Sequence, residues 1–360
     1  MIFMLRNIFF YFQRTSKFFR ESLGFLLILF KDYKSKKGSS ASIRVAYNGY
    51  PTGTKKEWLY TFLQELTGQK VAVSWYKPSV IFSSSFGSYW LLKIILGAVK
   101  APSVFFSEEN LATLKKYREY KTYLDGQPTL AMGFDYCSAE NYRRFPLWLM
   151  YIFSPEFSVK ASVDDIQERL NQMEKQSRCL KSKFTAMVAS HDGYASKKKV
   201  FGCLENTSRS FIAQKVSSID FVHCPGRLMH NDDSLKKDYN DDKISYLNQF
   251  LFNICAENAS VKGYVTEKIF QAIEGGTIPI YWGGNNPEPG ILNQQRIIFW
   301  NKDQIEDVLE KIKKLYFDMD TRKTFIEQPV FIDGAAKKIH HYFELLRSDL
   351  DMILADKNKK

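Results

Sequence analysis

The segment from Phe250 to Gly283 constrains the fold more than any other part of the chain. It opens with a short apolar run, Phe250–Cys255, and ends with a second one, Thr277–Trp282. Between these runs, apolar residues recur at helical spacing over Tyr264–Glu274, and the pair Gly275-Gly276 follows where such a helix would stop. The order strand, loop, helix, strand is one unit of a parallel α/β sheet.

Polar residues gather where this unit would bind a ligand, because ligand sites of parallel sheets lie beyond the carboxyl ends of the strands. Glu257 and Asn258 follow the first strand, and Thr266 begins the expected helix, where its hydroxyl can cap the first free amides. Lys268 adds a charge to a helix end that already favours phosphate, and Glu267 can accept hydrogen bonds from two sugar hydroxyls. The spacing alone equally allows Glu267 to match the helix dipole and Lys268 to be a solvated surface lysine.

A family resemblance follows from this segment. The string EN-x5-YVTEK-I, followed by TIPIYWG, resembles the donor-binding motif of the α-1,3/4-fucosyltransferases of glycosyltransferase family 10. Four upstream segments are similar to further motifs of that family. They are FFSEEN at 105–110, GFDY at 133–136, RFPL at 144–147 and CPGRLMHN at 224–231. The resemblance covers about residues 43–300 and implies an α/β fold with two Rossmann-like domains facing a cleft, the GT-B type, and a C-terminal helix that crosses back to the first domain.

The chain length and the alternation of expected strands and helices also predict two α/β domains. The small polar stretch at 38–42 is typical of a linker, and 154–159 is interpreted as the crossing between the domains. The expected divisions are a basic amphipathic segment at 1–37, an acceptor-binding domain at 38–155, a nucleotide-sugar donor-binding domain at 156–334, and a C-terminal helix and tail at 335–360.

The resemblance implies roles at two further strand ends. Glu109, which follows the strand expected at Val104–Phe106, aligns with the glutamate of the family's TGEN segment and would be the general base. Glu108 stands where the family has glycine, and adjacent side chains of a strand point to opposite faces, so only one of the two carboxylates is expected to enter the cleft. Arg227 would bind the donor pyrophosphate with its planar guanidinium. Without the resemblance, all three are more simply surface residues.

The implied enzyme is an inverting fucosyltransferase that moves fucose from GDP-fucose to a hydroxyl of an acceptor glycan, α-1,3 or α-1,4 to a GlcNAc-containing acceptor. The donor-binding residues are Arg227, Asn258, Tyr264, Glu267 and Lys268, with Glu257 as a possible addition. No Asp-x-Asp motif follows an expected strand, so no metal or other cofactor is expected. The alternative within the same class is a related glycosyltransferase that uses another nucleotide sugar.

The first 37 residues differ from the rest of the chain. They alternate apolar and basic residues and hold eight Lys or Arg against two Asp or Glu, half of the chain's net charge of +12. Their longest uncharged apolar run, 23–30, is shorter than the roughly 20 residues that cross a bilayer. We expect a basic helix on an anionic membrane surface, and the alternative is a helix that packs on the protein itself.

With the implied activity, this segment favours a peripheral enzyme on the inner face of a bacterial membrane, in glycan, lipopolysaccharide or O-antigen assembly. A Golgi-type membrane enzyme is the alternative. The positive charge also allows a nucleic-acid-binding protein, a different class altogether. Half of the excess charge lies beside aromatic and aliphatic clusters in the first 37 residues, however, and no nucleic-acid recognition motif is present, so no nucleic-acid partner is expected.

Overall fold

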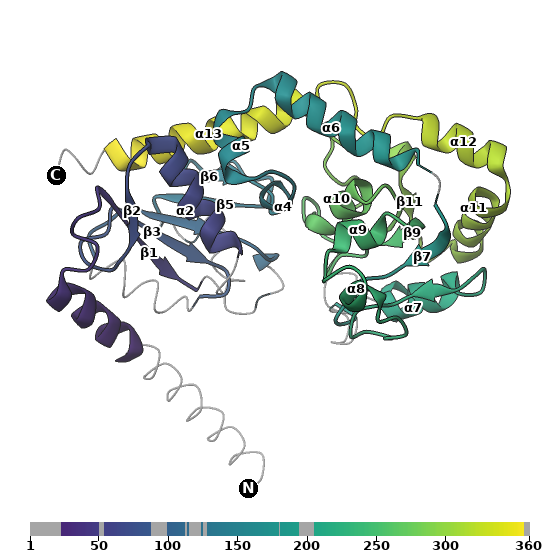
Figure 1. Cartoon of the computed structure of the whole chain (residues 1–360), viewed down its shortest axis with the longest axis horizontal. Coiled ribbons are helices and arrows are strands. Elements are labelled where there is room, and N and C mark those ends of the chain that lie inside the picture. The colour runs from purple at the N-terminus through teal and green to yellow at the C-terminus, as the bar shows by residue number, and fades with distance from the viewer. Residues whose placement is uncertain are drawn as a thin grey trace, which may run out of the picture.

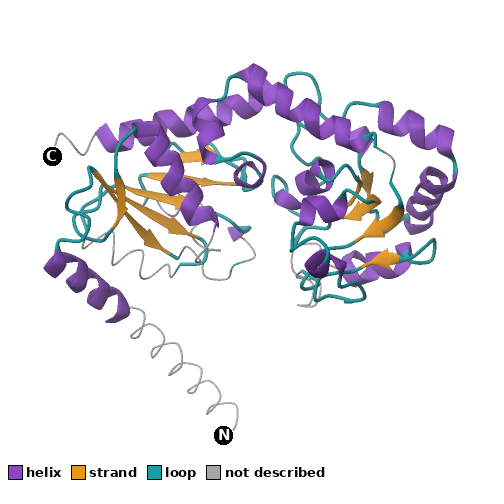
Figure 2. Ribbon diagram, viewed as in Figure 1, coloured by secondary structure: helices purple, strands orange, loops and turns teal. Residues whose placement is uncertain are grey.

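The computed structural model describes residues 23–49, 54–87, 99–111, 114, 124, 128–179, 181–193 and 205–355. These residues form two lobes, joined along one side by long helices (Figure 1). Each lobe is built on a parallel sheet with helices packed around it (Figure 2). The predicted α/β class with parallel sheets is therefore confirmed.

The N-terminal lobe contains a six-stranded sheet in the order β2-β1-β3-β4-β5-β6, and every pairing in it is parallel. Strands β3, β4 and β5 are buried along their whole length, as apolar runs covered on both faces require. Helix α2 packs its apolar side into the core. The elements are β1 Ile43–Asn48, α2 Thr54–Thr67, β2 Val71–Val73, β3 Val80–Ser84, β4 Ser103–Phe106, β5 Leu130–Gly133 and β6 Tyr142–Arg144.

The C-terminal lobe contains a five-stranded sheet in the order β11-β10-β9-β7-β8, again parallel throughout. The strand order reverses between β7 and β9, and such a reversal opens a crevice at the carboxyl ends of the two strands. The strands are β7 Lys183–Ala186, β8 Val222–His223, β9 Phe250–Ile254, β10 Ile278–Tyr281 and β11 Ile298–Phe299. The helices are α7 Arg209–Val216, α8 Ser234–Lys237, α9 Lys243–Leu247, α10 Glu267–Glu274, α11 Ile305–Phe317 and α12 Met319–Glu327.

Four helices connect the lobes: α4 Leu149–Ile152, α5 Pro155–Lys160, α6 Val163–Ser177 and α13 Ala335–Ala355. Helix α6 packs against α10 and α13, and α13 also reaches α5, so the chain's last helix returns to the N-terminal lobe (Figure 1). The hydrophobic core is continuous across this junction. Trp148 of the N-terminal side stacks on Phe270 of α10 with ring centroids 3.7 Å apart.

A buried ion pair also holds the lobes together. Arg144, at the end of β6, donates to both carboxylate oxygens of Glu288 at 2.7 and 3.1 Å. It further donates to the Tyr342 hydroxyl of α13 and to the Gly263 carbonyl, both at 3.2 Å. Burial alone would lower the pKa of Arg144, but the Glu288 carboxylate outweighs this effect and the pKa is raised. The arginine of the RFPL segment is therefore an anchor between the two sheets.

The basic N-terminal segment is described only from residue 23, and residues 1–22 of that prediction lie outside the described part. Residues 23–35 form a helix on the outer edge of the N-terminal lobe (Figure 1). Phe25 is buried there with its ring edge against Trp75, so packing on the protein, the alternative interpretation, holds for one face of this helix. Among the described residues, no helix combines the length and the hydropathy that crossing a bilayer requires.

Candidate active site

Arg209 occupies the crevice between the carboxyl ends of β7 and β9. It is the first residue of α7 and is buried. Its guanidinium donates to the carbonyls of His191, beyond β7, and Ala256, beyond β9, at 2.7 and 3.0 Å. A third bond, to the Asn258 side-chain oxygen, measures 2.7 Å. The sequence analysis missed Arg209. A cation in the first turn of a helix opposes the helix dipole, and this mismatch is the only local signal that it has partners elsewhere.

Glu257 organises the start of α10. Its buried carboxylate accepts from the backbone N–H and the hydroxyl of Thr266, both at 2.7 Å. The prediction that the Thr266 hydroxyl caps the helix is wrong, because that hydroxyl makes no cap hydrogen bond and donates to Glu257 instead. The carboxylate takes the free Thr266 amide, as a charged acceptor at a helix N-terminus does. The possible donor residue Glu257 is thus engaged within the protein.

The same carboxylate holds Lys268. The ammonium of Lys268 lies 3.1 Å from Glu257 Oε2, 2.7 Å from Thr266 Oγ1 and 3.9 Å from Glu267 Oε1. Burial alone would lower the pKa of Lys268, but Glu257 and Glu267 outweigh it and the pKa is raised. Lys268 is therefore a fixed cation at the helix start and not a solvated surface lysine.

Lys243 is a second residue that the sequence analysis missed. It begins α9 and donates to the Gln271 side-chain oxygen at 2.7 Å. Burial lowers its pKa, and Glu267 partly offsets that effect. Lys243, Arg209 and Lys268 line one small cavity of about 10 Å³. Three cations from three helices thus converge at the crevice. Their combined charge attracts an anion, which would lie at the mouth of the crevice because the cavity itself has room for about one water molecule.

Glu109 faces these residues from the N-terminal lobe. Its carboxylate accepts from Asn258 Nδ2 at 3.0 Å and from the Tyr264 hydroxyl at 2.8 Å. Burial raises the pKa of Glu109, although the hydrogen bond from Tyr264 lowers it in part. The Tyr264 ring is itself buried, with its edge against Phe134. The structure therefore brings together three predicted site residues, Glu109, Asn258 and Tyr264, from two lobes.

The turn after β4 separates the two neighbouring glutamates. The Ser107 hydroxyl donates to the Glu109 carbonyl at 2.5 Å, and the Glu108 backbone N–H donates to the Ser85 hydroxyl at 3.3 Å. Glu108 is 2% exposed and lies deeper in the lobe than the part-buried Glu109. Glu109 forms hydrogen bonds with two residues of the opposite lobe, Asn258 and Tyr264.

Arg227 and Glu267 lie at the edge of this group. Arg227 is exposed in the loop after β8, and no hydrogen bond or ion pair within the described ranges joins it to the other candidates. Its loop nonetheless reaches the crevice, because the Leu228 N–H donates to the Ala189 carbonyl beyond β7 at 3.1 Å. The Glu267 side chain, 21% exposed, is the more accessible of the two carboxylates beside Lys268. Metal-ligand clusters of three or more His, Cys, Asp or Glu are absent from the described residues.

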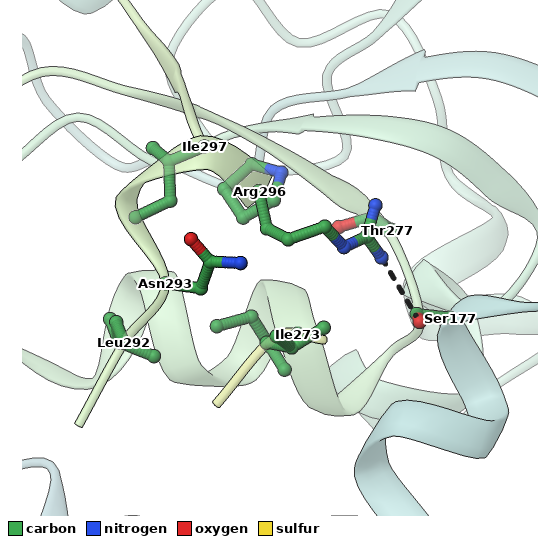
Figure 3. Close-up of a pocket in the computed structure, with 9 residues that line it drawn as sticks. Ser177, Ile273, Thr277, Leu292, Asn293, Arg296 and Ile297 are labelled. Atoms are coloured by element: carbon green, nitrogen blue, oxygen red, sulfur yellow. Dashed lines mark hydrogen bonds between the residues drawn. The ribbon is translucent and has the colours of Figure 1, made fainter. Parts of the chain in front are cut away.

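A separate pocket below α10 is structural. Arg296 donates to the Ser177 hydroxyl at 3.2 Å, and Asn293, Thr277 and Ile273 lie around it (Figure 3). Burial lowers the pKa of Arg296 to about 10. The cavity of about 10 Å³ has room for about one water molecule, so it cannot hold a sugar. The hydrogen bond from Arg296 to Ser177, the last residue of α6, joins α6 to the C-terminal lobe.

Two Rossmann-like lobes, with a cationic crevice in one and a part-buried carboxylate facing it from the other, have the arrangement of the GT-B fold. The family model for glycosyltransferase family 10 (fucosyltransferase), C-terminal part, matches residues 189–326. The resemblance to glycosyltransferase family 10 that the sequence indicated is therefore confirmed for this part of the chain.

Individual relatives agree with this assignment. The chain is 26% identical over 323 residues to an α-(1,3)-fucosyltransferase of Helicobacter pylori, covering 81% of this chain and 63% of that protein. It thus spans less than two thirds of that relative's length. An α-(1,3)-fucosyltransferase of Drosophila melanogaster is 31% identical over 121 residues, which cover 30% of this chain and 26% of that protein.

Solved structures show the same fold. A crystal structure of an α1,3-fucosyltransferase aligns with a TM-score of 0.56 and 21% identity over 85% of this chain and 90% of that one. The same coverage is found for an α1,3-fucosyltransferase crystallised with GDP-fucose, with a TM-score of 0.54 and 19% identity.

Proposed function

We propose that this protein transfers fucose from GDP-fucose to a hydroxyl of an acceptor glycan, with inversion at the anomeric carbon and an α-1,3 linkage. The observation that carries the proposal is the pair of part-buried hydrogen bonds between Glu109 and two residues of the C-terminal lobe, Asn258 and Tyr264, at the mouth of a cationic crevice. The names of the relatives support the sugar, the nucleotide and the linkage.

The diphosphate of the donor is assigned to the crevice. Arg209 offers a planar guanidinium and Lys268 a fixed ammonium at the start of α10, and both suit phosphate oxygens. Arg227 would add a third contact once a nucleotide is bound, because its loop is hydrogen-bonded to Ala189 beside the crevice. Negative charge grows on the leaving GDP, so these cations stabilise the transition state more than the ground state. Protein cations would then do the work for which other glycosyltransferases use a divalent metal, and no metal is required.

Glu109 is assigned the general base. The acceptor hydroxyl oxygen attacks the anomeric carbon of fucose while the bond from that carbon to the phosphate oxygen breaks. The hydroxyl proton passes to Glu109, and GDP leaves on the opposite face, which inverts the centre. A buried carboxylate with a raised pKa holds this proton better than a solvated one, and such tuning is typical of catalytic bases.

The sugar and ribose hydroxyls are assigned to the rest of the group. Glu267 keeps an accessible carboxylate beside Lys268, which suits two neighbouring hydroxyls. Asn258 and Tyr264 both donate to Glu109, and Asn258 also accepts from Arg209 in the crevice, so they would align the base with the anomeric carbon. A GlcNAc-containing glycan is the proposed acceptor, and glycan or lipopolysaccharide assembly at the inner face of a bacterial membrane is the proposed setting.

The deciding experiment is a transfer assay with a panel of donors and acceptors. Purified full-length protein is incubated with GDP-fucose, GDP-mannose or a UDP-sugar and with GlcNAc-containing oligosaccharides, and the product linkage is read by NMR. We expect transfer from GDP-fucose alone, giving an α-linked fucose on the 3-hydroxyl. Turnover of another donor, with none from GDP-fucose, would overturn the donor assignment and leave the family intact.

A further inference from the structure

The helix at residues 23–35 has two apolar faces, and only one of them is covered. The inner face holds Phe25, 6% exposed, with its ring 4.9 Å from that of Trp75. One heptad further on, the Asp32 carboxylate accepts the Trp75 backbone N–H at 2.8 Å. These contacts fix the helix on the N-terminal lobe, against β1 and β3 through Ala46 and Ile81.

The outer face is a stripe of large apolar side chains in water. Its members recur at the i, i+3, i+4, i+7 spacing that places residues on one side of a helix, opposite Phe25 and Asp32. They are Leu23, 59% exposed, Leu26, 54%, Leu27, 61%, and Phe30, 68%. Four adjacent large apolar residues, each more than half exposed, form a patch of the kind that a partner or a lipid surface covers.

Lysines continue the stripe and border it. Lys31 and Lys34 follow Leu27 and Phe30 by four residues each, which places them one turn further along the same side of the helix. Both are exposed, as are Lys36 and Lys37 just after the helix. Lysine side chains at the rim of an apolar helix face can hold their charges at the headgroups of a lipid surface.

We propose that this outer face docks on an anionic lipid surface, with the four apolar side chains in the interface and the lysines at the headgroups. The same face of a second copy fits less well, because Asp32, the one acidic residue within 23–35, is bonded to Trp75 on the inner face and a second copy would offer no counter-charge to Lys31 and Lys34. A spanning arrangement is excluded for this helix, since its inner face is held by the protein. Because Phe25 and Asp32 hold this helix on Trp75, docking on lipid would also fix the orientation of the N-terminal lobe, which carries Glu109.

The test is co-sedimentation of the full chain with vesicles of equimolar phosphatidylglycerol and phosphatidylcholine, and with phosphatidylcholine alone. We expect binding to the anionic vesicles only. The triple substitution Leu26→Gln, Leu27→Gln and Phe30→Gln should weaken partitioning about tenfold or more, because it removes most of the apolar area available to the interface. Lys31→Gln with Lys34→Gln should weaken it about tenfold and reduce its salt dependence.

The matched control is Phe317→Gln with Met352→Gln, which replaces side chains that are 70% and 56% exposed elsewhere on the surface. This variant should bind vesicles as the parent does, and all variants should melt at the parent temperature. The proposal is overturned if the triple variant sediments like the parent, or if neutral vesicles bind equally well. It is also overturned if the triple substitution converts a dimer to a monomer without lipid while vesicle binding persists, since the face then belongs to a second copy.

Discussion

Tyr264→Phe tests whether a residue of the C-terminal lobe sets the pKa of Glu109. The substitution removes the hydroxyl that donates to Glu109 at 2.8 Å and keeps the ring packed against Phe134. That hydrogen bond lowers the pKa of Glu109 against the effect of burial, so its loss raises the pKa further. A hydrogen bond to a charged group contributes about 1.5–3 kcal/mol. The substitution therefore stabilises the protonated, inactive form of Glu109 relative to the charged form by about 1.5–3 kcal/mol.

The expected result is a shift of the acidic limb of kcat/KM to higher pH. On that limb the variant should be about 10- to 100-fold slower than the parent, and above it the two rates should converge. The matched control is Tyr246→Phe, which removes another buried hydroxyl that donates to a carboxylate, Asp232, also at 2.8 Å. An equal loss of rate at every pH in Tyr264→Phe, or the same shift in Tyr246→Phe, would refute the reasoning.

Four other predictions follow from the site and the junction. Glu109→Gln should lose fucosyl transfer by at least ~10²-fold and keep its GDP affinity by calorimetry, and retained turnover would remove its role as base. Lys268→Ala should raise the donor KM and lower kcat together, and unchanged GDP affinity would count against a phosphate contact. Arg209→Lys should weaken GDP binding, because an ammonium replaces only part of a planar fork, whereas parent-like binding would make Arg209 purely structural. Arg144→Met leaves Glu288 buried without its partner and should lower the free energy of unfolding, measured in urea, by about 3–5 kcal/mol. A loss under about 1 kcal/mol would contradict the role of Arg144 as an anchor between the two sheets.

The strands and helices of the C-terminal lobe were predictable because their sequence signals are local. The apolar runs Phe250–Cys255 and Thr277–Trp282 contain β9 and β10, and the helical spacing over Tyr264–Glu274 contains α10. The helix itself begins only at Glu267, three residues later than the apolar spacing indicates. The prediction that Thr266 caps this helix was wrong because the partner of its hydroxyl, Glu257, lies nine residues upstream and approaches only through the fold.

The candidate site was predictable only in part. Glu109, Asn258 and Tyr264 were found through family motifs, and their meeting across two lobes is a property of the tertiary structure. Arg209 and Lys243 were missed, because a cation at the start of a helix is a weak local signal and their partners lie far away in the sequence. Their convergence with Lys268 depends on the strand order of the sheet, which no window of sequence contains.

The position of Glu109 between two lobes ties proton binding to the distance between them. With the lobes together, burial raises the pKa of Glu109, and separation would return the carboxylate to water and its ordinary pKa. By linkage, exposure of this carboxylate to water would favour release of the proton that it holds. Each opening for product release would therefore give back the proton that the base received from the acceptor. Separation of the lobes would therefore be one way for the base to lose its proton before the next turnover.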